Sequence, residues 1–350
     1  MIVEFVRRIR QSMQAEKTIL IKNGASLEWI PSGLLVLSHR MIFQSSTQAL
    51  FGEIELDQLE KDFRLFDDKF HYFNASIPRW LLSWAVPKEF SARSRLNSSW
   101  MKDPSPSHQS QLMDARQTLF LQNSDWLRKR DAATFQTGFL WASLGNTIPA
   151  VFWCLFYILH DATAIETITR ELDTYLPFFS LDTDADESVV EEWTPERLSS
   201  CVYLDSAVNE TLRLAGAPLM TRQCRQETEI VLQDGRTLNV QPNETVAHFV
   251  AATHFDANLF PEPDRFIFDR FVHKNPDGIL GFMPFGGGKT MCPGRFFARN
   301  EMKICLAMLL RYMEYQFVDT GRIPMQQSHR VGFGVAPPSE DVKILYRYKL

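Results

Sequence analysis

Four glycines and a proline surround one cysteine near the carboxyl end of the chain, in FGGGKTMCPGRF at residues 285–296. A cysteine that only packs in a core needs no such surroundings, whereas a metal-bound thiolate must approach its partner closely. Glycine lets the backbone pass close to a flat cofactor and adopt positive φ. The glycines are Gly286, Gly287, Gly288 and Gly294. The pattern is typical of a thiolate ligand to haem iron, with Cys292 as the axial ligand.

Two further residues of this loop fit the same chemistry. Phe285 could cover the sulfur as an apolar lid. Pro293 would stiffen the exit into the next helix, where a proline in the first turn is tolerated. The alternative interpretation of the loop taken alone is a glycine-rich turn around an incidental buried cysteine.

A pair of polar residues lies inside an apolar stretch, GFLWASLGNTIPAVFWCLF at 138–156. The stretch is apolar on all sides, which predicts a buried helix. Pro149 lacks an N–H and displaces the carbonyl of Gly145, so the helix should open there. Asn146 and Thr147 stand in that opening and, with the free carbonyl, could hold an ordered water that passes protons toward oxygen at a haem. The alternative is a kinked core helix whose threonine bonds its own backbone.

Most of the remaining sequence predicts helices that would position these groups. The segment 228–240 alternates in polarity and turns at Asp234-Gly235, which predicts a β-hairpin. The tail segments YQFVDTG and DVKILYRYKL resemble strands. Helices are expected near 2–17, 26–51, 55–74, 110–130, 131–160, 163–177, 195–214 and 296–314. The fold class is therefore expected to be predominantly α with small β-sheets (α+β).

Composition narrows the function classes. The chain has 350 residues, 45% of them hydrophobic, and a net charge of -5, so no basic excess points to nucleic acid. Its five cysteines are scattered and lack paired spacing, which argues against a disulfide framework or a zinc site and favours a reducing compartment. No segment is expected to supply the roughly 20 apolar residues of a membrane-spanning helix.

The cysteine loop resembles the haem-binding signature of the cytochrome P450 family. The matching residues are Phe285, Gly288, Cys292 and Gly294, while Thr290 stands where the family often has Arg or His. The resemblance implies a cytochrome P450 fold that binds haem b (iron protoporphyrin IX). It also implies a single domain over 1–350 with a haem-binding core at 131–350.

Three other motifs follow the order of that family. Glu210 and Arg213 stand three positions apart in a predicted helix and can pair. FPEPDRFIFDRF at 260–271 resembles the family's proline-rich segment, which implies that Arg265 joins them in a buried ion network. The resemblance also implies that Arg222 reaches a haem propionate. On the distal helix, Thr147 matches the family's proton-steering threonine, and Asn146 replaces the usual acidic residue.

Longer matches narrow the group. The stretches WASLGNTIPAVFW, LRLAGAPLMTR and VGFGVAPPSEDV are similar to the group that contains cholesterol and oxysterol 7α-hydroxylases, sterol 12α-hydroxylases and prostacyclin synthase. The resemblance implies a monooxygenase that hydroxylates a sterol-, steroid- or terpenoid-like substrate with O2 and electrons from NADPH-cytochrome P450 reductase. A haem-thiolate isomerase of the prostacyclin synthase type and a truncated, non-catalytic remnant remain open alternatives.

The resemblance also leads to expectations for partners and location. Basic residues near the cysteine could dock an acidic electron donor, or could form an ordinary solvated face. They are Lys289, Arg295, Arg299 and Lys303. Apolar, mostly small residues are expected to line the substrate pocket. They are Ala142, Leu144, Ala217, Pro218, Leu219, Met220 and Val335. Endoplasmic reticulum membrane is the implied location, and the chain is expected to be N-terminally truncated, without the family's anchor and first helices.

Overall fold

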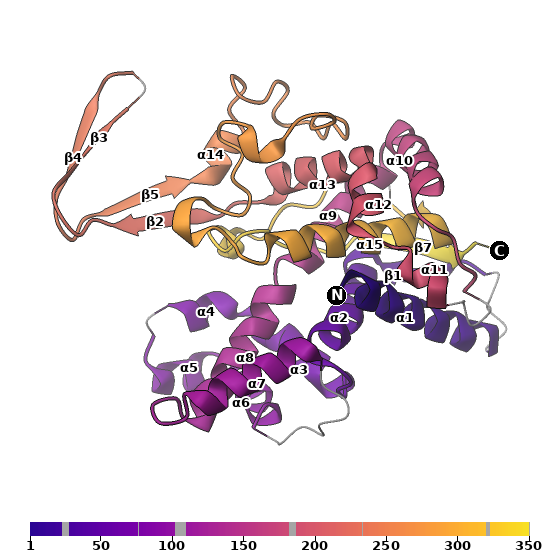
Figure 1. The fold of residues 1–350 in the computed structure, drawn as a ribbon, viewed down its shortest axis with the longest axis horizontal. Coiled ribbons are helices and arrows are strands. Elements are labelled where there is room, and N and C mark those ends of the chain that lie inside the picture. Colours follow the sequence, from indigo (N-terminus) through magenta and orange to yellow (C-terminus); the bar gives the residue numbers. More distant parts are fainter. Residues whose placement is uncertain are drawn as a thin grey trace.

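The computed structural model describes residues 1–22, 28–75, 77–101, 110–181, 187–232, 234–319 and 323–349. These residues form many helices and a few short antiparallel strands, which confirms the expected α+β class (Figure 1). The helices are α1 (Ile2–Lys22), α2 (Leu34–Phe51), α3 (Asp57–Asp68), α4 (Phe70–Asn74), α5 (Arg79–Ala85), α6 (Pro87–Ser99), α7 (Gln111–Gln122), α8 (Lys129–Leu144), α9 (Thr147–Leu159), α10 (Ala162–Tyr175), α11 (Glu187–Glu191), α12 (Pro195–Ser200), α13 (Val202–Ala215), α14 (Val250–His254) and α15 (Arg295–Tyr312). The strands are β1 (Ile30–Gly33), β2 (Leu219–Gln223), β3 (Thr228–Val231), β4 (Thr237–Val240), β5 (Thr245–Phe249), β6 (Met313–Phe317) and β7 (Lys343–Tyr348).

Helix α9 lies at the centre of the main body. Its sequence TIPAVFWCLFYIL is apolar on every face, and 11 of its 13 residues are buried. It packs against α2, α10, α13 and α15, so neighbouring helices cover all of its sides. A helix of this composition gains most when no face meets water.

The stretch 129–159, which comprises α8 and α9, is long and apolar enough to cross a membrane. This corrects the expectation that no segment would be. However, 72% of the most apolar 18-residue segment of this stretch is buried inside the protein. Packing between the protein's own helices therefore accounts for its hydrophobicity.

The break predicted at Pro149 is present. Helix α8 ends at Leu144, Gly145 and Asn146 form a turn, and α9 begins at Thr147. The N–H of Ala150 donates to the carbonyl of Asn146, so regular bonding resumes immediately after the turn. The missing N–H of the proline thus divides one long apolar segment into two helices.

The start of the predicted helix 26–51 is wrong, because residues 30–33 form strand β1. This strand pairs antiparallel with β7, which also pairs with β6. Helix α2 begins only at Leu34, where the carboxylate of Asp341 accepts hydrogen bonds from the N–H groups of Leu35 (2.7 Å) and Val36 (3.1 Å). The N-terminus of α2 is therefore capped from the far end of the chain.

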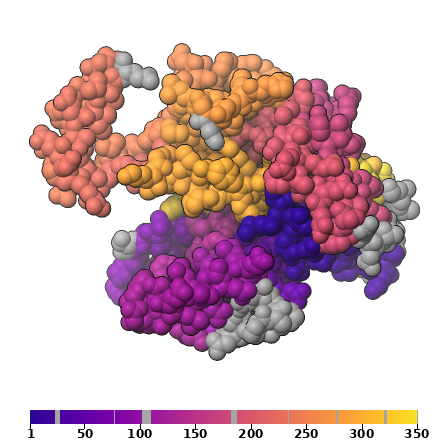
Figure 2. All heavy atoms as spheres, viewed as in Figure 1, coloured from indigo at the N-terminus to yellow at the C-terminus, as the bar shows by residue number. Residues whose placement is uncertain are grey.

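Two of the small β-sheets form an arm at one side of the main body, opposite the sheet that contains β1 and β7 (Figure 1). Strands β3 and β4 form the predicted hairpin, and β2 pairs with β5. This arm projects away from the helices, while α3 to α8 form a separate lower lobe beneath α15 (Figures 1 and 2). Sequence interpretation missed α5 and α6. The segment MKDPSPSHQS at 101–110 is rich in Pro and Ser, which predicts a loop, but it falls almost wholly on residues 102–109, outside the described residues.

Candidate functional site

The cysteine loop is closed by its own backbone. The N–H of Cys292 donates to the carbonyl of Phe285 at 3.0 Å, and Cys292 itself is exposed. Gly286 and Gly288 have φ of 76° and 66°, a conformation that favours glycine. The other two glycines do not need it, since φ is -149° at Gly287 and -80° at Gly294. The expectation of positive φ is corrected for those two.

Strand β2 braces this loop from one side. A Cβ on Gly286 would lie 3.5 Å from Sδ of Met220, so the loop and the strand are in close contact. Nη2 of Arg222 donates to the carbonyl of Gly287 (2.9 Å) and to Oγ1 of Thr290 (2.6 Å). Arg222 therefore lies at the cysteine loop, and its contact with a propionate stays a prediction.

The buried ion network contains Arg270 where Arg265 was predicted. Glu210 accepts two hydrogen bonds from Arg213 (2.8 and 2.9 Å) and two from Nε of Arg270 (2.9 and 3.0 Å). The side chains of Glu210 and Arg213 are fully buried. The side chain of Arg265 turns to solvent and pairs with Glu262, and only its carbonyl accepts from Arg213. The proline-rich segment contains two arginines, and it is the second that points inward.

His254 connects this network to the cysteine loop and was missed from the sequence. Its Nδ1 bonds the carbonyl of Arg213 (3.1 Å), and its Nε2 accepts from the N–H of Met283 (3.1 Å). Burial is the main cause that lowers the pKa of His254 to about 4. The neutral tautomer with Nδ1 protonated satisfies both bonds. A lone histidine in VAATHF carries no sequence signal for this role.

The opened turn of the distal helix is filled by protein groups. The carbonyl of Gly145 accepts a hydrogen bond from Nη2 of the buried Arg330 at 3.0 Å. Oδ1 of Asn146 accepts from the N–H of Val335 at 3.0 Å. The expectation of a free carbonyl that holds water is therefore wrong, because the tail of the chain occupies that position. Sequence interpretation missed Arg330, which lies 185 residues from Gly145.

Thr147 is buried, and its hydroxyl donates to the carbonyl of Ser143 at 3.1 Å. A second buried group, Glu301 of α15, accepts a hydrogen bond from Oγ of Ser46. Burial raises the pKa of Glu301 well above its ordinary value, and hydrogen bonding with Thr147 acts in the opposite direction. The helix that follows the cysteine therefore places the carboxyl of Glu301 beside the distal threonine.

The expected substrate residues separate into two sets. Ala142, Leu219 and Met220 are exposed or half-buried. Leu144 is 1% exposed and packs in the main core, and its place in the pocket stays a prediction. It lies two positions after Ala142, which turns it to the other side of the helix. Pro218 is half-buried as well, whereas Ala217 and Val335 are buried.

The expected basic face is smaller than its spacing indicated. Lys303 is buried, and its Nζ lies 3.0 Å from Oδ1 of Asp205. The guanidinium of Arg299 lies over the ring of Phe285, 5.2 Å from its centroid. Lys303 is corrected as a docking residue, because it is buried and paired. Lys289 is exposed, and Arg295 and Arg299 are half-buried, so their role in docking stays a prediction.

Comparison with known proteins now adds the family. The family model described as Cytochrome P450 matches residues 44–344. The chain belongs to the cytochrome P450 family. Among its relatives, Cytochrome P450 7A1 of Oryctolagus cuniculus is 31% identical, over 93% of this chain and 68% of the relative. The 7-alpha-hydroxycholest-4-en-3-one 12-alpha-hydroxylase of Oryctolagus cuniculus is 30% identical, over 92% and 67%.

A third relative, Cholesterol 7-alpha-monooxygenase of Cricetulus griseus, is 28% identical, over 92% of this chain and 67% of the relative. The chain thus spans about two thirds of the length of these relatives. With the family, they place it among oxidoreductases of the monooxygenase class, close to the sterol 7-alpha- and 12-alpha-hydroxylases.

The family implies a haem cofactor, and the residues present fit one. Cys292 is accessible rather than buried, which a thiolate ligand to an added group requires. Gly286, Gly287 and Gly294 keep side chains away from the backbone beside it, and a Cβ on Gly294 would lie 3.8 Å from the sulfur. The contacts of the loop with Arg222 on strand β2, and the bond between His254 and Met283, hold the loop in position through protein groups alone.

Proposed function

We propose that this protein is a haem-thiolate monooxygenase that hydroxylates a hydrophobic, sterol-like molecule. It would use haem b, O2 and electrons from an NADPH-dependent reductase. The observation that carries the proposal is the exposed Cys292, held on a loop braced by Arg222 and two positive-φ glycines. As part of the proposal, residues 1–350 form one domain, and 131–350 form its haem-binding core.

The chain's own residues would divide the work as follows. Bound haem would supply the activation of oxygen, with Cys292 as its thiolate ligand. Phe285, Gly286, Gly288 and Gly294 would shape the surface beneath the ring. Arg222 would keep the loop in register and reach a propionate. The Glu210, Arg213 and Arg270 network would hold the loop's entrance rigid through the contact between His254 and Met283.

Proton handling would fall to the distal turn. The hydroxyl of Thr147 now donates to the carbonyl of Ser143 and would exchange that bond for one toward the haem side. Its oxygen could then receive a proton from the carboxyl of Glu301, whose raised pKa keeps the proton available. Asn146 would hold the turn open through its bond to Val335.

Substrate selection would depend on apolar contact. Ala142 on α8 and Leu219 with Met220 on β2 present small or flexible apolar surface. Such residues fit a rigid, bulky molecule mainly by shape and burial. The relatives whose names specify hydroxylation of sterols support a sterol-like substrate here.

Partner and location are proposed from the surface. Lys289 and Arg295 would attract an acidic electron-donor protein near the cysteine side. Trp80 and Trp84 lie one turn apart on α5 and are 73% and 79% exposed. Tryptophan favours the membrane–water interface, which supports contact with the endoplasmic reticulum membrane.

The decisive experiment is the absorption spectrum of the purified chain after reduction and addition of carbon monoxide. A strongly red-shifted Soret band is expected, because a thiolate ligand pushes electron density onto the iron. Cys292→Ala should abolish the shift, while Cys224→Ala on the β arm should keep it. A wild-type band typical of histidine ligation would refute Cys292 as the ligand. A shift that survives Cys292→Ala would refute it equally.

A further inference from the structure

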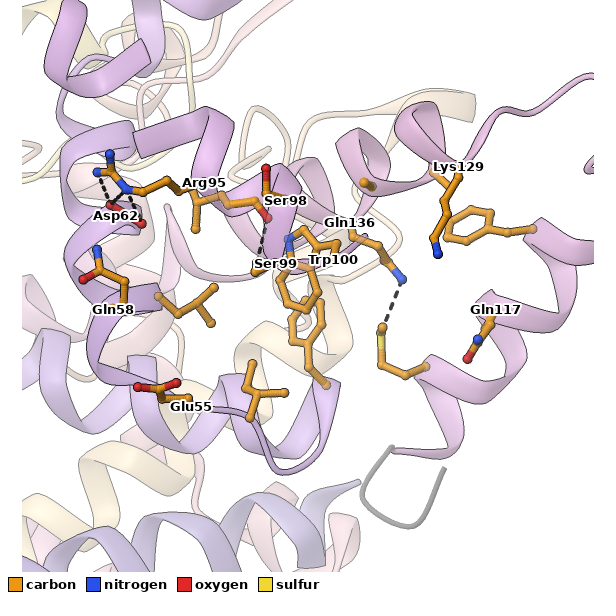
Figure 3. Close-up of a pocket in the computed structure, with 18 of the residues that line it drawn as sticks. Glu55, Gln58, Asp62, Arg95, Ser98, Ser99, Trp100, Gln117, Lys129 and Gln136 are labelled. Atoms are coloured by element: carbon orange, nitrogen blue, oxygen red, sulfur yellow. Dashed lines mark hydrogen bonds and ion pairs between the residues drawn. The ribbon is translucent and has the colours of Figure 1, made fainter. Parts of the chain in front are cut away.

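A cavity of about 800 Å³ lies in the lower lobe, away from the cysteine loop. Helices α3, α6, α7 and α8 and the end of α2 enclose it (Figure 3). Its lining residues fall between Phe51 and Gln136, so none belongs to the cysteine loop, strand β2 or the distal turn. The volume lies within the roughly 300–1,000 Å³ of typical small-molecule sites.

The cavity wall is mainly apolar. Leu59 comes from α3, Leu96 from α6 and Ala133 from α8, and all three are buried. Phe51 stacks on the ring of Trp100, with centroids 5.0 Å apart. A rigid apolar molecule could replace water along this whole surface, which is the main source of affinity in such sites.

A few polar groups lie between the ends of the cavity. Nε2 of Gln136 donates only to the thioether of Met113, at 3.5 Å, which is a weak acceptor. The indole N–H of Trp100 is buried and has no hydrogen-bond partner within the described residues. A ligand oxygen would be a better acceptor for the Gln136 amide than the Met113 thioether is. After a small rotation of the Trp100 ring, a ligand oxygen could also accept from the indole N–H.

The charges at the cavity are already neutralised where they are buried. Asp62 is nearly buried, and its carboxylate accepts three hydrogen bonds from Arg95 at 2.5–3.0 Å. Figure 3 shows this pair at one end of the cavity and Gln117 with Lys129 at the other. Between these ends, Figure 3 shows the amide of Gln136, the indole of Trp100 and the hydroxyls of Ser98 and Ser99. These polar groups are uncharged, so the site favours an uncharged ligand.

We infer that this cavity is a second ligand site, separate from the haem site, for an uncharged apolar molecule of sterol size that carries hydroxyl or carbonyl groups. Its occupant belongs to the same chemical class as the proposed substrate. Only the choice of probe below rests on the proposed function, because the cavity itself involves no haem-site residue.

The test is equilibrium dialysis of the full chain with radiolabelled 25-hydroxycholesterol, beside a titration of the Soret band with the same sterol. Dialysis should count one more bound sterol per chain than the Soret response reports. That extra sterol should also bind haem-free protein, so loss of the Soret response alone would count against the proposed function and leave this site standing.

Two exposed leucines of the α7 region provide a matched pair. Leu121 is 68% exposed and lines the cavity, whereas Leu119 is 56% exposed and lies outside its lining. Leu121→Glu should weaken the extra binding about tenfold, because its carboxylate resists burial under an apolar ligand. Leu119→Glu should leave it unchanged. Neither change removes a core contact, so both proteins should fold.

A third variant, Ala132→Trp, fills the cavity wall and should remove the extra sterol while the Soret response persists. Equal counts from dialysis and the Soret titration in the wild-type protein would overturn the inference. So would an equal loss of binding in Leu121→Glu and Leu119→Glu.

Discussion

His254 should make the stability of the protein depend on pH in a narrow acidic window. Its ring is fully buried, donates from Nδ1 to the carbonyl of Arg213 and accepts at Nε2 from Met283. A second proton on the ring would turn the accepting nitrogen into a donor that faces another donor. Burial and the nearby charge of Arg213 lower the pKa to about 4, against an ordinary value of 6.5.

The sign follows from the lowered pKa. The fold favours the neutral ring, so this contribution to stability is fully present above pH 6.5 and is lost as pH falls toward 4. The difference between 6.5 and about 4 corresponds to roughly 3 kcal/mol in total. Between pH 7 and pH 5, about 2 kcal/mol of the unfolding free energy should disappear through this group.

Urea unfolding at pH 7 and pH 5 would measure it. His254→Phe removes the titrating ring, and it leaves a carbonyl and an N–H unpaired at a cost of about 1–3 kcal/mol each. That variant should be less stable at pH 7 but should lose about 2 kcal/mol less than the wild type on going to pH 5. His273→Asn, at an exposed position with φ of 58°, should keep the wild-type pH dependence. Identical pH dependence in wild type and His254→Phe would refute the reasoning.

Three further predictions concern the network, the distal turn and the α2 cap. Arg270→Ala should lower the unfolding free energy by about 3–5 kcal/mol, because it removes one of the two arginines that neutralise the buried carboxylate of Glu210. Arg265→Ala, at an exposed ion pair, should change it by less than about 1 kcal/mol. Urea unfolding of both variants compares the two effects. Thr147→Ala should reduce the product formed per O2 consumed by about tenfold or more, and Thr147→Ser should retain most of the wild-type ratio. The same ratio in the wild type and both variants would contradict a role of the threonine in proton transfer. Asp341→Ala should cost about 1–2 kcal/mol in thermal unfolding, because it removes the acceptor that caps α2, and an unchanged melting temperature would contradict that role.

The features that could be predicted from sequence are those whose cause is local. A proline inside an apolar helix breaks it within one turn, and the break was found between Gly145 and Thr147. An Asp-Gly turn between alternating segments makes a hairpin, and β3 and β4 form one. The positive φ angles of Gly286 and Gly288 near Cys292 likewise depend on the conformation of a few successive residues.

The features that sequence interpretation missed or misplaced depend on distant packing. Spacing put Lys303 on a basic face, but the partner that buries it, Asp205, comes from another helix. The proline-rich segment contains two arginines, and only the folded chain determines that Arg270 faces Glu210. The predicted helix 26–51 begins before Leu34, yet pairing with β7 makes residues 30–33 a strand.

The distal turn shows how such a distant contact changes the chemistry expected of a local motif. An opened helix turn exposes a carbonyl, and from sequence alone water is its natural partner. Here Arg330 takes that carbonyl, and its Nη1 also donates to Asp67 at 2.8 Å. Gly334 has φ of 104° and passes so close to Asn146 that a Cβ there would lie 2.4 Å from Oδ1.

The tail of the chain therefore packs closely against the turn. The carbonyl of Gly145 and the side chain of Asn146 both bond the tail, through Arg330 and Val335. The hydroxyl of Thr147, with the carboxyl of Glu301 beside it, is the group available for the proposed proton transfer. The hydroxyl of Thr147 bonds the carbonyl of Ser143 at the end of α8, and neither group bonds the tail among the described residues. The proposed proton transfer therefore depends on the hydroxyl of Thr147, next to a turn that the tail of the chain holds in place.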